Sequence, residues 1–180
     1  MDQAGIAALR RDLLPLLCAR GEATRVGGGL FLTERGAGSD LGQVQTQAVR
    51  DGSGYRLSGD KWFCAGVDAG VILALARVVG PGVSEDSTGT RGLGLFALTP
   101  HLPDGRRNGI VIHRLKETLG LRGLPIGEVS LSGAWARAVG PVGGSVGGHS
   151  SASSSGVTSG PSTPGSLALG QGFKPVTEIL

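Results

Sequence analysis

The feature that most constrains the fold is a succession of short apolar segments, separated by turn-forming residues, between residues 29 and 131. No helical pattern lies between them, and strands joined in this way are typical of sandwiches and barrels. The nearly continuous apolar run at 71–79 predicts a buried central strand, and Asp51-Gly52-Ser53-Gly54 predicts a hairpin turn. We therefore expect a mainly β, barrel-like domain, with strands near 30–33, 43–50, 55–58, 71–79, 93–98, 110–115 and 128–131.

The segments that flank this region have a different character. Residues 3–17 carry apolar side chains at helical spacing, with Asp2 as an N-cap and Pro15 expected to bend or end the helix. Residues 140–166 are rich in Gly, Ser and Pro and cannot bury enough apolar surface to offset chain entropy, which predicts a flexible linker. The last residues, 171–180, turn apolar and helix-like again.

Composition excludes several classes of protein. The net charge is +3 and charged residues make up 17% of the chain, unlike the dense Lys/Arg stripe of a nucleic-acid binder. Cys18 and Cys64 fit neither a disulfide framework nor a zinc site, and the three histidines form no metal constellation. Because neither a signal peptide nor a membrane-length apolar run is evident, we expect a soluble cytoplasmic protein that binds no metal.

The stretch from Leu30 to Asp40, with Thr33, Gly38 and Ser39, is the most informative about chemistry. A strand leads here into a loop whose glycines let backbone amides approach a ligand, and whose hydroxyls add donors. Such a loop can hold an anion. On spacing alone, an ordinary β-turn with hydrogen-bonding side chains is the favoured interpretation, because short Gly-rich matches are weak signals.

Two later stretches are also open to two interpretations. Trp62-Phe63, followed by small residues, could form a wall for a planar ring, but strand neighbours point to opposite faces and so could split between core and surface. Lys116 and Arg122, within residues 114–129, could meet phosphates or could lie in a solvated hairpin connection. The residues alone favour the second interpretation in both cases.

Taken together, the stretches resemble the acyl-CoA dehydrogenase family. Thr33-Glu34-Arg35-Gly36-Ala37-Gly38-Ser39-Asp40 resembles its first signature, and Leu57-Ser58-Gly59-Asp60-Lys61-Trp62-Phe63 resembles the continuation about twenty residues later. Lys116 to Pro125 and Glu128-Val129 follow in the family's order. Trp62-Phe63 and Leu102 to Asn108 resemble most closely the AidB-like branch, which is linked to alkylation damage.

The resemblance implies a Greek-key-like β-barrel middle domain between two helical domains, and an FAD cofactor. Thr33 would contact the isoalloxazine, Ser39 would lie near the pyrophosphate and the substrate, and Phe63 would stack near the flavin ring. The implied reaction removes an α-proton and transfers a β-hydride to flavin N5, which converts an acyl-CoA into an enoyl-CoA. The implied cofactor-binding residues are Leu30, Phe31, Leu32, Thr33, Gly38, Ser39, Phe63, Cys64 and Ala65.

The resemblance also divides the chain. It implies a remnant of the N-terminal helical domain at 1–27, the barrel at 28–139, a linker at 140–170 and the start of a C-terminal helical domain at 171–180. The family's catalytic glutamate lies in that last domain, so we expect no catalytic residue in this chain, weak FAD binding and no activity in isolation. The implied partners are acyl-CoA, the other helical domains and, in a full-length form, further copies in a homo-oligomer.

This sequence departs from the family at Ala65, where the family has a Thr or Ser that hydrogen-bonds the reactive edge of the flavin. Two alternatives to a dehydrogenase therefore stay open. One is a non-catalytic barrel that serves as a binding module, and the other is an AidB-like alkylation-response flavoprotein. The AidB-like alternative would associate with nucleic acid, and it is the least favoured because the sequence has no clustered Lys/Arg run.

Overall fold

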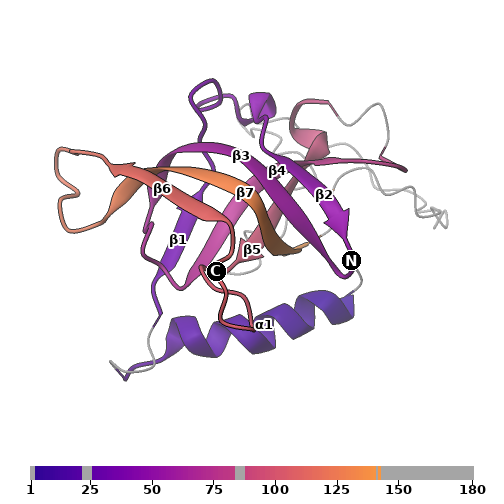
Figure 1. The fold of residues 1–180 in the computed structure, drawn as a ribbon, viewed down its shortest axis with the longest axis horizontal. Coiled ribbons are helices and arrows are strands. Elements are labelled where there is room, and N and C mark those ends of the chain that lie inside the picture. The colour runs from indigo at the N-terminus through magenta and orange to yellow at the C-terminus, as the bar shows by residue number, and fades with distance from the viewer. Residues whose placement is uncertain (1–2, 22–25, 84–87, 141, 143–180) are drawn as a thin grey trace, which may run out of the picture.

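The computed structural model describes residues 3–21, 26–83, 88–140 and 142 (Figure 1). Its strands form a single seven-stranded sheet, which confirms the mainly β class with one short N-terminal helix. The elements, in chain order, are α1 (Gln3–Cys18), β1 (Gly28–Phe31), a 3-10 turn (Leu41–Gln43), β2 (Gln47–Asp51), β3 (Gly54–Ala65), β4 (Val71–Val79), a second 3-10 turn (Gly89–Gly92), β5 (Leu93–Leu98), β6 (Ile110–Leu115) and β7 (Ile126–Ala138).

The sheet closes on itself as a barrel. Going round it, β3 pairs with β2, β2 with β4, β4 with β5, and β5 with β7, and β7 returns to pair with β3. Strand β6 pairs with β7, and the hairpin that they form projects from the body at the left of Figure 1. Closure removes most of the free sheet edges that would otherwise invite pairing with other chains.

Strands β1 and β2 share one position in the barrel, end to end, between β3 and β4. Gly28–Phe31 runs parallel to the first half of β4, at 71–74, and β2 runs parallel to its second half, at 77–79. The intervening residues, 32–46, leave the sheet, and we call them the excursion. The first signature of the sequence lies in this excursion, at a point where a strand of the barrel is interrupted.

The interior of the barrel is packed with a few large side chains and many alanines. Phe31, Leu57, Ile72 and Phe96 are fully buried, and the ring of Tyr55 meets that of Phe96 edge-on with centroids 5.0 Å apart. Small residues suit the inside of a narrow barrel, since opposing strands leave little room between them. The alanines of this core are Ala48, Ala69, Ala74, Ala76, Ala134, Ala136 and Ala138.

The outer face of β4 and β5 is covered as well, which explains why both strands are apolar on both sides. The helix α1 packs Leu9 against Leu95 and Ala97, and Figure 1 shows it lying along the underside of the barrel. Beside it, the excursion packs Ala37 and Val44 against the outward side chains of the same two strands. The apolar run at 71–79 is therefore a buried strand, as predicted.

Several predicted boundaries were wrong. Pro15 does not end the helix, although the observed range Gln3–Cys18 agrees with the predicted 3–17. Residues 43–46 do not belong to a strand, although side chains alternate between exposed and buried from Gln43 to Val49, as the pattern predicted. The expected strand at 55–58 is the first part of the longer β3, and the strand expected at 128–131 extends over Ile126–Ala138. Sequence pattern located these strands, but pairing with neighbours set their lengths.

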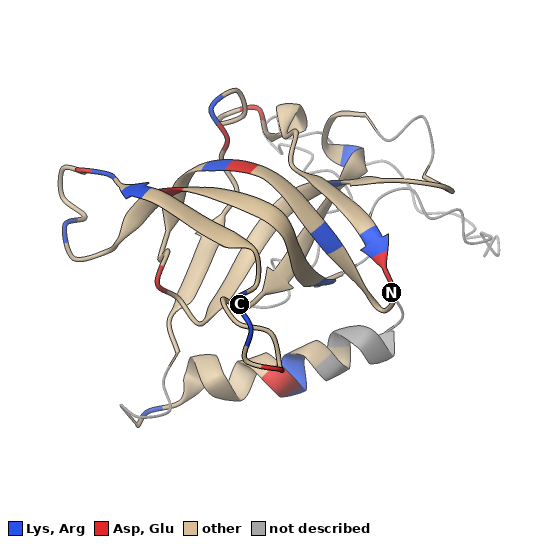
Figure 2. Ribbon diagram, viewed as in Figure 1, with Lys and Arg blue, Asp and Glu red and all other residues tan. Residues whose placement is uncertain are grey.

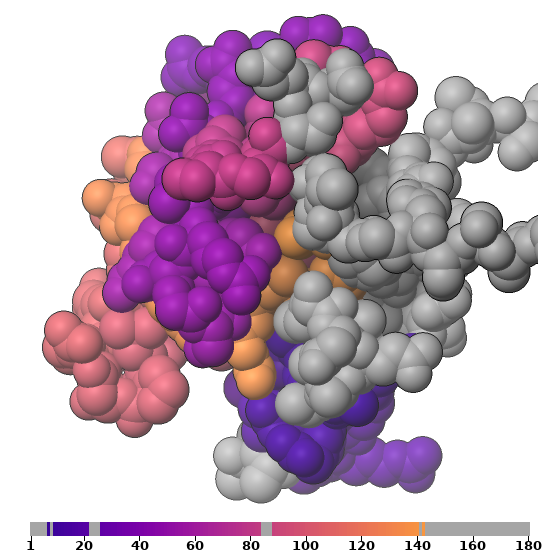
Figure 3. All heavy atoms as spheres, turned by 90° about the vertical axis from the view of Figure 1, so that its right-hand side faces the viewer, coloured from indigo at the N-terminus to yellow at the C-terminus, as the bar shows by residue number. Residues whose placement is uncertain are grey.

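The loop at 99–109, between β5 and β6, stands out from the body in the side view of Figure 3. Asn108 anchors it, because its buried Nδ2 atom donates to the carbonyl oxygens of Thr99 and Trp135, each at 2.8 Å. In the opposite direction, the amide of Trp135 donates to Asn108 Oδ1 at 2.7 Å. Residues 102–108 thus belong to an ordered loop.

The linker expected at 140–170 lies almost wholly outside the described residues, as do the helix start at 171–180 and the capping role of Asp2. In the part of the chain that is described, no helix is long and apolar enough to cross a membrane, and no group of three or more metal-ligating side chains occurs. Figure 2 shows the described Lys, Arg, Asp and Glu scattered over the barrel rather than gathered in a stripe.

Candidate functional site

The two stretches that predict a flavin site lie side by side. Leu30 of β1 pairs with Ala65 of β3 in antiparallel register. Just beyond β1, the carbonyl oxygen of Thr33 accepts a hydrogen bond from the amide of Trp62 at 2.9 Å. Residues 30–33 and 62–65, separated by about thirty positions in the sequence, therefore form one patch on the barrel wall.

The predicted contact residues divide between the outside and the inside of that wall. Leu30 and Phe63 are 45% and 52% exposed, and Ala65 is half-buried on the same outer face. Phe31 and Cys64 point into the core and are fully buried. Their side chains face the barrel interior, so only their backbone could meet a ligand on the outer face.

Burial also sets the chemistry of Cys64. It raises the pKa of the Cys64 thiol to about 12, although the cations of Lys61 and Lys116 act in the opposite direction. The thiol therefore stays protonated near neutral pH and is a poor nucleophile, because the thiolate is the reactive form.

The loop after Thr33 offers hydrogen-bond donors to solvent. A tight turn forms where the amide of Glu34 donates to the carbonyl of Ala37 at 3.0 Å and the Ala37 amide returns a bond at 3.2 Å. Gly38 and Ser39 follow it and are exposed, and Gly38 lies against the Thr33 side chain. Within the described residues, the hydroxyls of Thr33 and Ser39 make no hydrogen bond, so both can donate to an anionic or carbonyl-bearing ligand.

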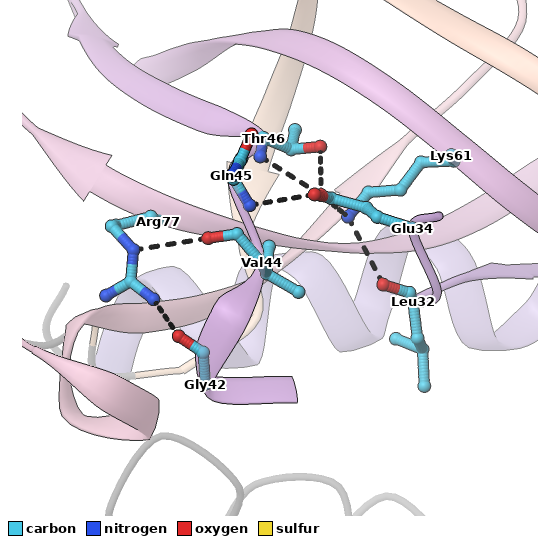
Figure 4. A network of polar contacts seen from close by, with 8 residues as sticks. All are labelled: Leu32, Glu34, Gly42, Val44, Gln45, Thr46, Lys61 and Arg77. Carbon is cyan, nitrogen blue, oxygen red and sulfur yellow. Dashed lines mark hydrogen bonds and ion pairs between the residues drawn. The ribbon is translucent and has the colours of Figure 1, made fainter. Parts of the chain in front are cut away.

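A buried ion pair closes the base of this loop (Figure 4). Lys61 has a fully buried side chain, and its Nζ atom lies 2.7 Å from Glu34 Oε1 and 3.3 Å from the carbonyl oxygen of Leu32. The Glu34 carboxylate also accepts bonds from the amides of Gln45 and Thr46, at 2.8 and 3.0 Å, and from the Thr46 hydroxyl at 2.5 Å. It thereby ties the start of the excursion to its end.

The protonation of this pair follows from its surroundings. Burial alone would raise the pKa of Glu34, but hydrogen bonds from Lys61, Thr46 and the Gln45 amide outweigh it and hold that pKa below its usual value. Burial lowers the pKa of Lys61, and the Glu34 carboxylate opposes this. Both groups are buried and bonded to other parts of the fold, so neither is free to act on a substrate.

Two further contacts fix the excursion. Arg77 of β4 donates from Nε to the carbonyl of Val44 at 3.2 Å and from Nη2 to the carbonyl of Gly42 at 2.7 Å (Figure 4). Gly59 of β3 has φ +151°, and a Cβ there would stand 2.6 Å from the Thr46 hydroxyl. The glycine of the second signature is thus required where the excursion returns to the barrel.

A β-bulge explains the exposure of the two aromatic residues. From Lys61 to Cys64 the strand β3 advances three residues, while β7 advances two, from Val129 to Gly127. Lys61 and Cys64 both point inward, and Trp62 and Phe63 between them both avoid the core. The expected split of these aromatics between core and surface is therefore wrong, because the extra residue breaks the alternation.

Cations surround the ring of Trp62. The Arg35 guanidinium and the Lys116 ammonium lie 3.9 and 3.5 Å from its centroid, and the Lys116 ammonium is also 4.6 Å from the centroid of Phe63. Glu128 of β7 balances these charges: its Oε1 atom lies 2.7 Å from Lys116 Nζ, and it is also paired with Arg114. We call Trp62, Phe63, Lys116 and Glu128 the aromatic cluster.

The pKa of Glu128 is held at about 2, first by its hydrogen bond from Arg114 and then by the bond from Lys116, against a burial effect that acts in the opposite direction. Neither Glu128 nor Glu34 has the raised pKa of a general base poised near neutral pH. Within the described residues, these two carboxylates serve the architecture of the site.

An apolar groove of about 270 Å³ adjoins Leu30. Leu13, Leu14 and Leu17 of α1 form one wall, and Gly28, Gly29, Leu30, Val71 and Leu73 line the other. Leu14 and Leu17 remain about 40% exposed, so this end of the patch is a surface that further apolar groups can cover.

Sequence reasoning missed Glu34, Lys61, Thr46 and Glu128 as parts of the site. A signal for the first two was present, since a Glu in the first signature and a Lys in the second are charged residues inside otherwise strand-like segments. Such charges are rarely buried unless they are paired.

We predict that Lys61→Met destabilises the fold by about 3–5 kcal/mol, because it leaves a buried carboxylate without its cation. Urea denaturation measures this. Arg56→Met is the matched control, since Arg56 lies on β3 like Lys61 but forms an exposed pair with Asp51 of β2, and its loss should cost under about 1 kcal/mol. The double variant Glu34→Gln/Lys61→Met should recover part of the loss. Equal effects of the Lys61 and Arg56 substitutions would contradict a buried, structural pair.

We also predict a specific acid dependence from Glu128. Its folded pKa, about 2, lies below the ordinary 4.5, so the stability it contributes is fully present above pH 4.5 and is lost as pH falls toward about 2. The stability difference between the unchanged chain and Glu128→Gln should shrink over that window in urea denaturation. A carbon-13 NMR titration of Glu128 with a midpoint near 4.5 would show that the cations do not hold the carboxylate.

Comparison with known proteins agrees with this geometry. Residues 29–134 match the family described as acyl-CoA dehydrogenase, middle domain. Acyl-CoA dehydrogenase family member 11 of Caenorhabditis elegans is 44% identical over 124 residues, which cover 68% of this chain and 20% of that protein. AidB of Escherichia coli (strain K12) is 41% identical over 96 residues, covering 52% and 16% respectively.

A solved structure gives the same result for the fold. The crystal structure of Caenorhabditis elegans ACDH-11 in complex with C11-CoA superposes with a TM-score of 0.66 at 36% identity, over 79% of this chain and 26% of that one. The chain thus spans about a fifth of the length of these curated relatives and about a quarter of that solved structure. The match of residues 29–134, more than half of the sequence, shows that the chain belongs to the acyl-CoA dehydrogenase family and carries its middle domain.

Proposed function

We propose that this barrel is the flavin-facing half of an FAD-dependent acyl-CoA dehydrogenase site. The observation that carries the proposal is the convergence of residues 30–33 and 62–65 on one outer face, through the Leu30–Ala65 pairing and the bond between Thr33 and Trp62. FAD, when bound, supplies the hydride acceptor for the oxidation of an acyl-CoA to an enoyl-CoA.

The described residues fit such a ligand. Leu30 and Phe63 offer an apolar, partly exposed surface for a planar ring, and Thr33 and Ser39 have hydroxyls with no partner in the described chain. Backbone amides at Gly38 and Ser39 add donors suited to a pyrophosphate. In this proposal Thr33 orients the ring system, Ser39 binds near the phosphates, and Leu32, Cys64 and Phe31 contribute backbone groups.

The proposal assigns no base to this chain. Glu34 and Glu128 are both engaged in ion pairs that hold their pKa values low, and in this proposal the base that removes an α-proton comes from outside the described barrel. The apolar groove beside α1 gives further helical segments a surface to pack on. We accordingly propose that acyl-CoA, additional helical domains and other copies of the full-length protein are the partners.

The finer assignment to the AidB-like branch is also a proposal. Its support is the 41% identity to AidB and the ordered loop that ends at Asn108. The charges of the described barrel favour no nucleic-acid surface, because Arg106 pairs with Asp104, and Arg114 and Lys116 share Glu128. A non-catalytic binding module is the second candidate, favoured by the missing hydroxyl at Ala65.

We predict that the purified 180-residue chain binds FAD weakly, and that Thr33→Ala and Ser39→Ala each raise the dissociation constant roughly three- to tenfold, since each removes about one hydrogen bond. Fluorescence titration of FAD measures this. Ser53→Ala is the matched control, because Ser53 is exposed in the turn between β2 and β3. Equal affinity in all four chains, or no binding by the folded unchanged chain, would contradict the proposal.

A gain of affinity tests the role of position 65. We predict that Ala65→Thr tightens FAD binding roughly three- to tenfold through one new hydrogen bond. Ala65→Val is the control, because valine matches the shape of threonine but has no hydroxyl. The same affinity for the Thr and Val variants would mean that position 65 does not face the flavin edge.

A further inference from the structure

Lys116 occupies an unusual place at the end of β6. Its amide donates to the carbonyl of Ile126 at 2.7 Å, which fixes its backbone against β7. Its side chain is only 11% exposed and points back over the Trp62 and Phe63 rings of β3, and its ammonium bonds to Glu128 of β7 at 2.7 Å. A lysine side chain normally extends into solvent, so this burial must be offset by specific contacts.

Those contacts are the two rings exposed by the bulge. The ammonium lies 3.5 Å from the Trp62 centroid and 4.6 Å from the Phe63 centroid, both within cation–π range. The rings themselves meet nearly perpendicular, at 89°, with centroids 6.3 Å apart. The Lys116 ammonium thus contacts both rings, and both rings lie at the β-bulge of β3.

The neighbouring cations cannot replace it. Arg35 reaches Trp62 at 3.9 Å, but its side chain is 75% exposed. Arg114 lies 5.9 Å from the Trp62 centroid and has a side chain that is 64% exposed. Among the described cations, only Lys116 is both buried and in contact with Phe63.

We infer that Lys116 is a positioning residue, which holds Trp62 and Phe63 in the orientation that presents the exposed ring of Phe63 to the flavin. Its role for the flavin rests on the proposed function, whereas its hold on the rings does not. Through these contacts, Lys116 also links the end of β6, where the connection to β7 begins, to the outer face of β3 that carries the two rings.

The test separates the hold on the rings from flavin binding. Near-ultraviolet circular dichroism and acrylamide quenching of Trp62 are recorded on the FAD-free chain, in a Trp135→Phe background that leaves Trp62 as the only tryptophan. The test variant is Lys116→Met, which keeps the aliphatic stem, and Lys116→Arg is the conservative rescue. Arg114→Met is the matched control, because it removes another partner of Glu128 without touching Phe63.

The expected result is a loss of the aromatic circular dichroism signal and greater quenching in Lys116→Met alone, with both restored in Lys116→Arg. The FAD dissociation constant should rise roughly three- to tenfold in the same variant, as expected for losing a cation–π contact that orders the ring. Should Lys116→Met not fold, Lys116→Gln takes its place.

The inference is overturned if the Lys116→Met spectra match those of Arg114→Met, or if the spectra change while FAD affinity does not. Failure of the unchanged chain to bind FAD would count against the proposed function and the flavin role together. The spectra of the FAD-free chain would still decide whether Lys116 holds the rings.

Discussion

The ion pair between Lys61 and Glu34 is the interaction on which the rest of the structure depends. One strand position of the barrel is filled by β1 and β2 end to end, and the excursion between them leaves a gap facing the middle of β3. Lys61 fills that gap, and Glu34 joins both ends of the excursion to it. Because the loop that carries Thr33, Gly38 and Ser39 starts from this point, its position is set before any ligand arrives.

Irregularity in β3 has a second consequence. A regular strand would have buried either Trp62 or Phe63, and the bulge instead directs both away from the core while Lys61 and Cys64 face inward. Bulges commonly occur beside functional sites, where they redirect side chains. The inward position of Lys61 and the exposure of both rings thus result from the same local departure from alternation. Lys116, just after β6, contacts the two rings, and Glu128 of β7 neutralises its charge.

The regular parts of the fold could be predicted from the sequence and the irregular parts could not. The apolar run of β4 and the turn at 51–54 follow directly from periodicity and turn chemistry. The bulge at Trp62 and the pairing of Lys61 with Glu34, twenty-seven positions away, depend on tertiary contacts that no local pattern encodes. The candidate flavin residues came from the family resemblance, since spacing alone favoured an ordinary turn and a split aromatic pair.

The most direct test of a preorganised half-site is NMR chemical-shift mapping of FAD on the isotope-labelled 180-residue chain. If the account holds, added FAD shifts the amides of residues 30–39 and 62–66, leaves those of β2 unchanged, and does so without altering the strand pairing of the free chain. Shifts centred elsewhere on the barrel, or a loop at 33–39 that becomes ordered only when FAD is added, would contradict it.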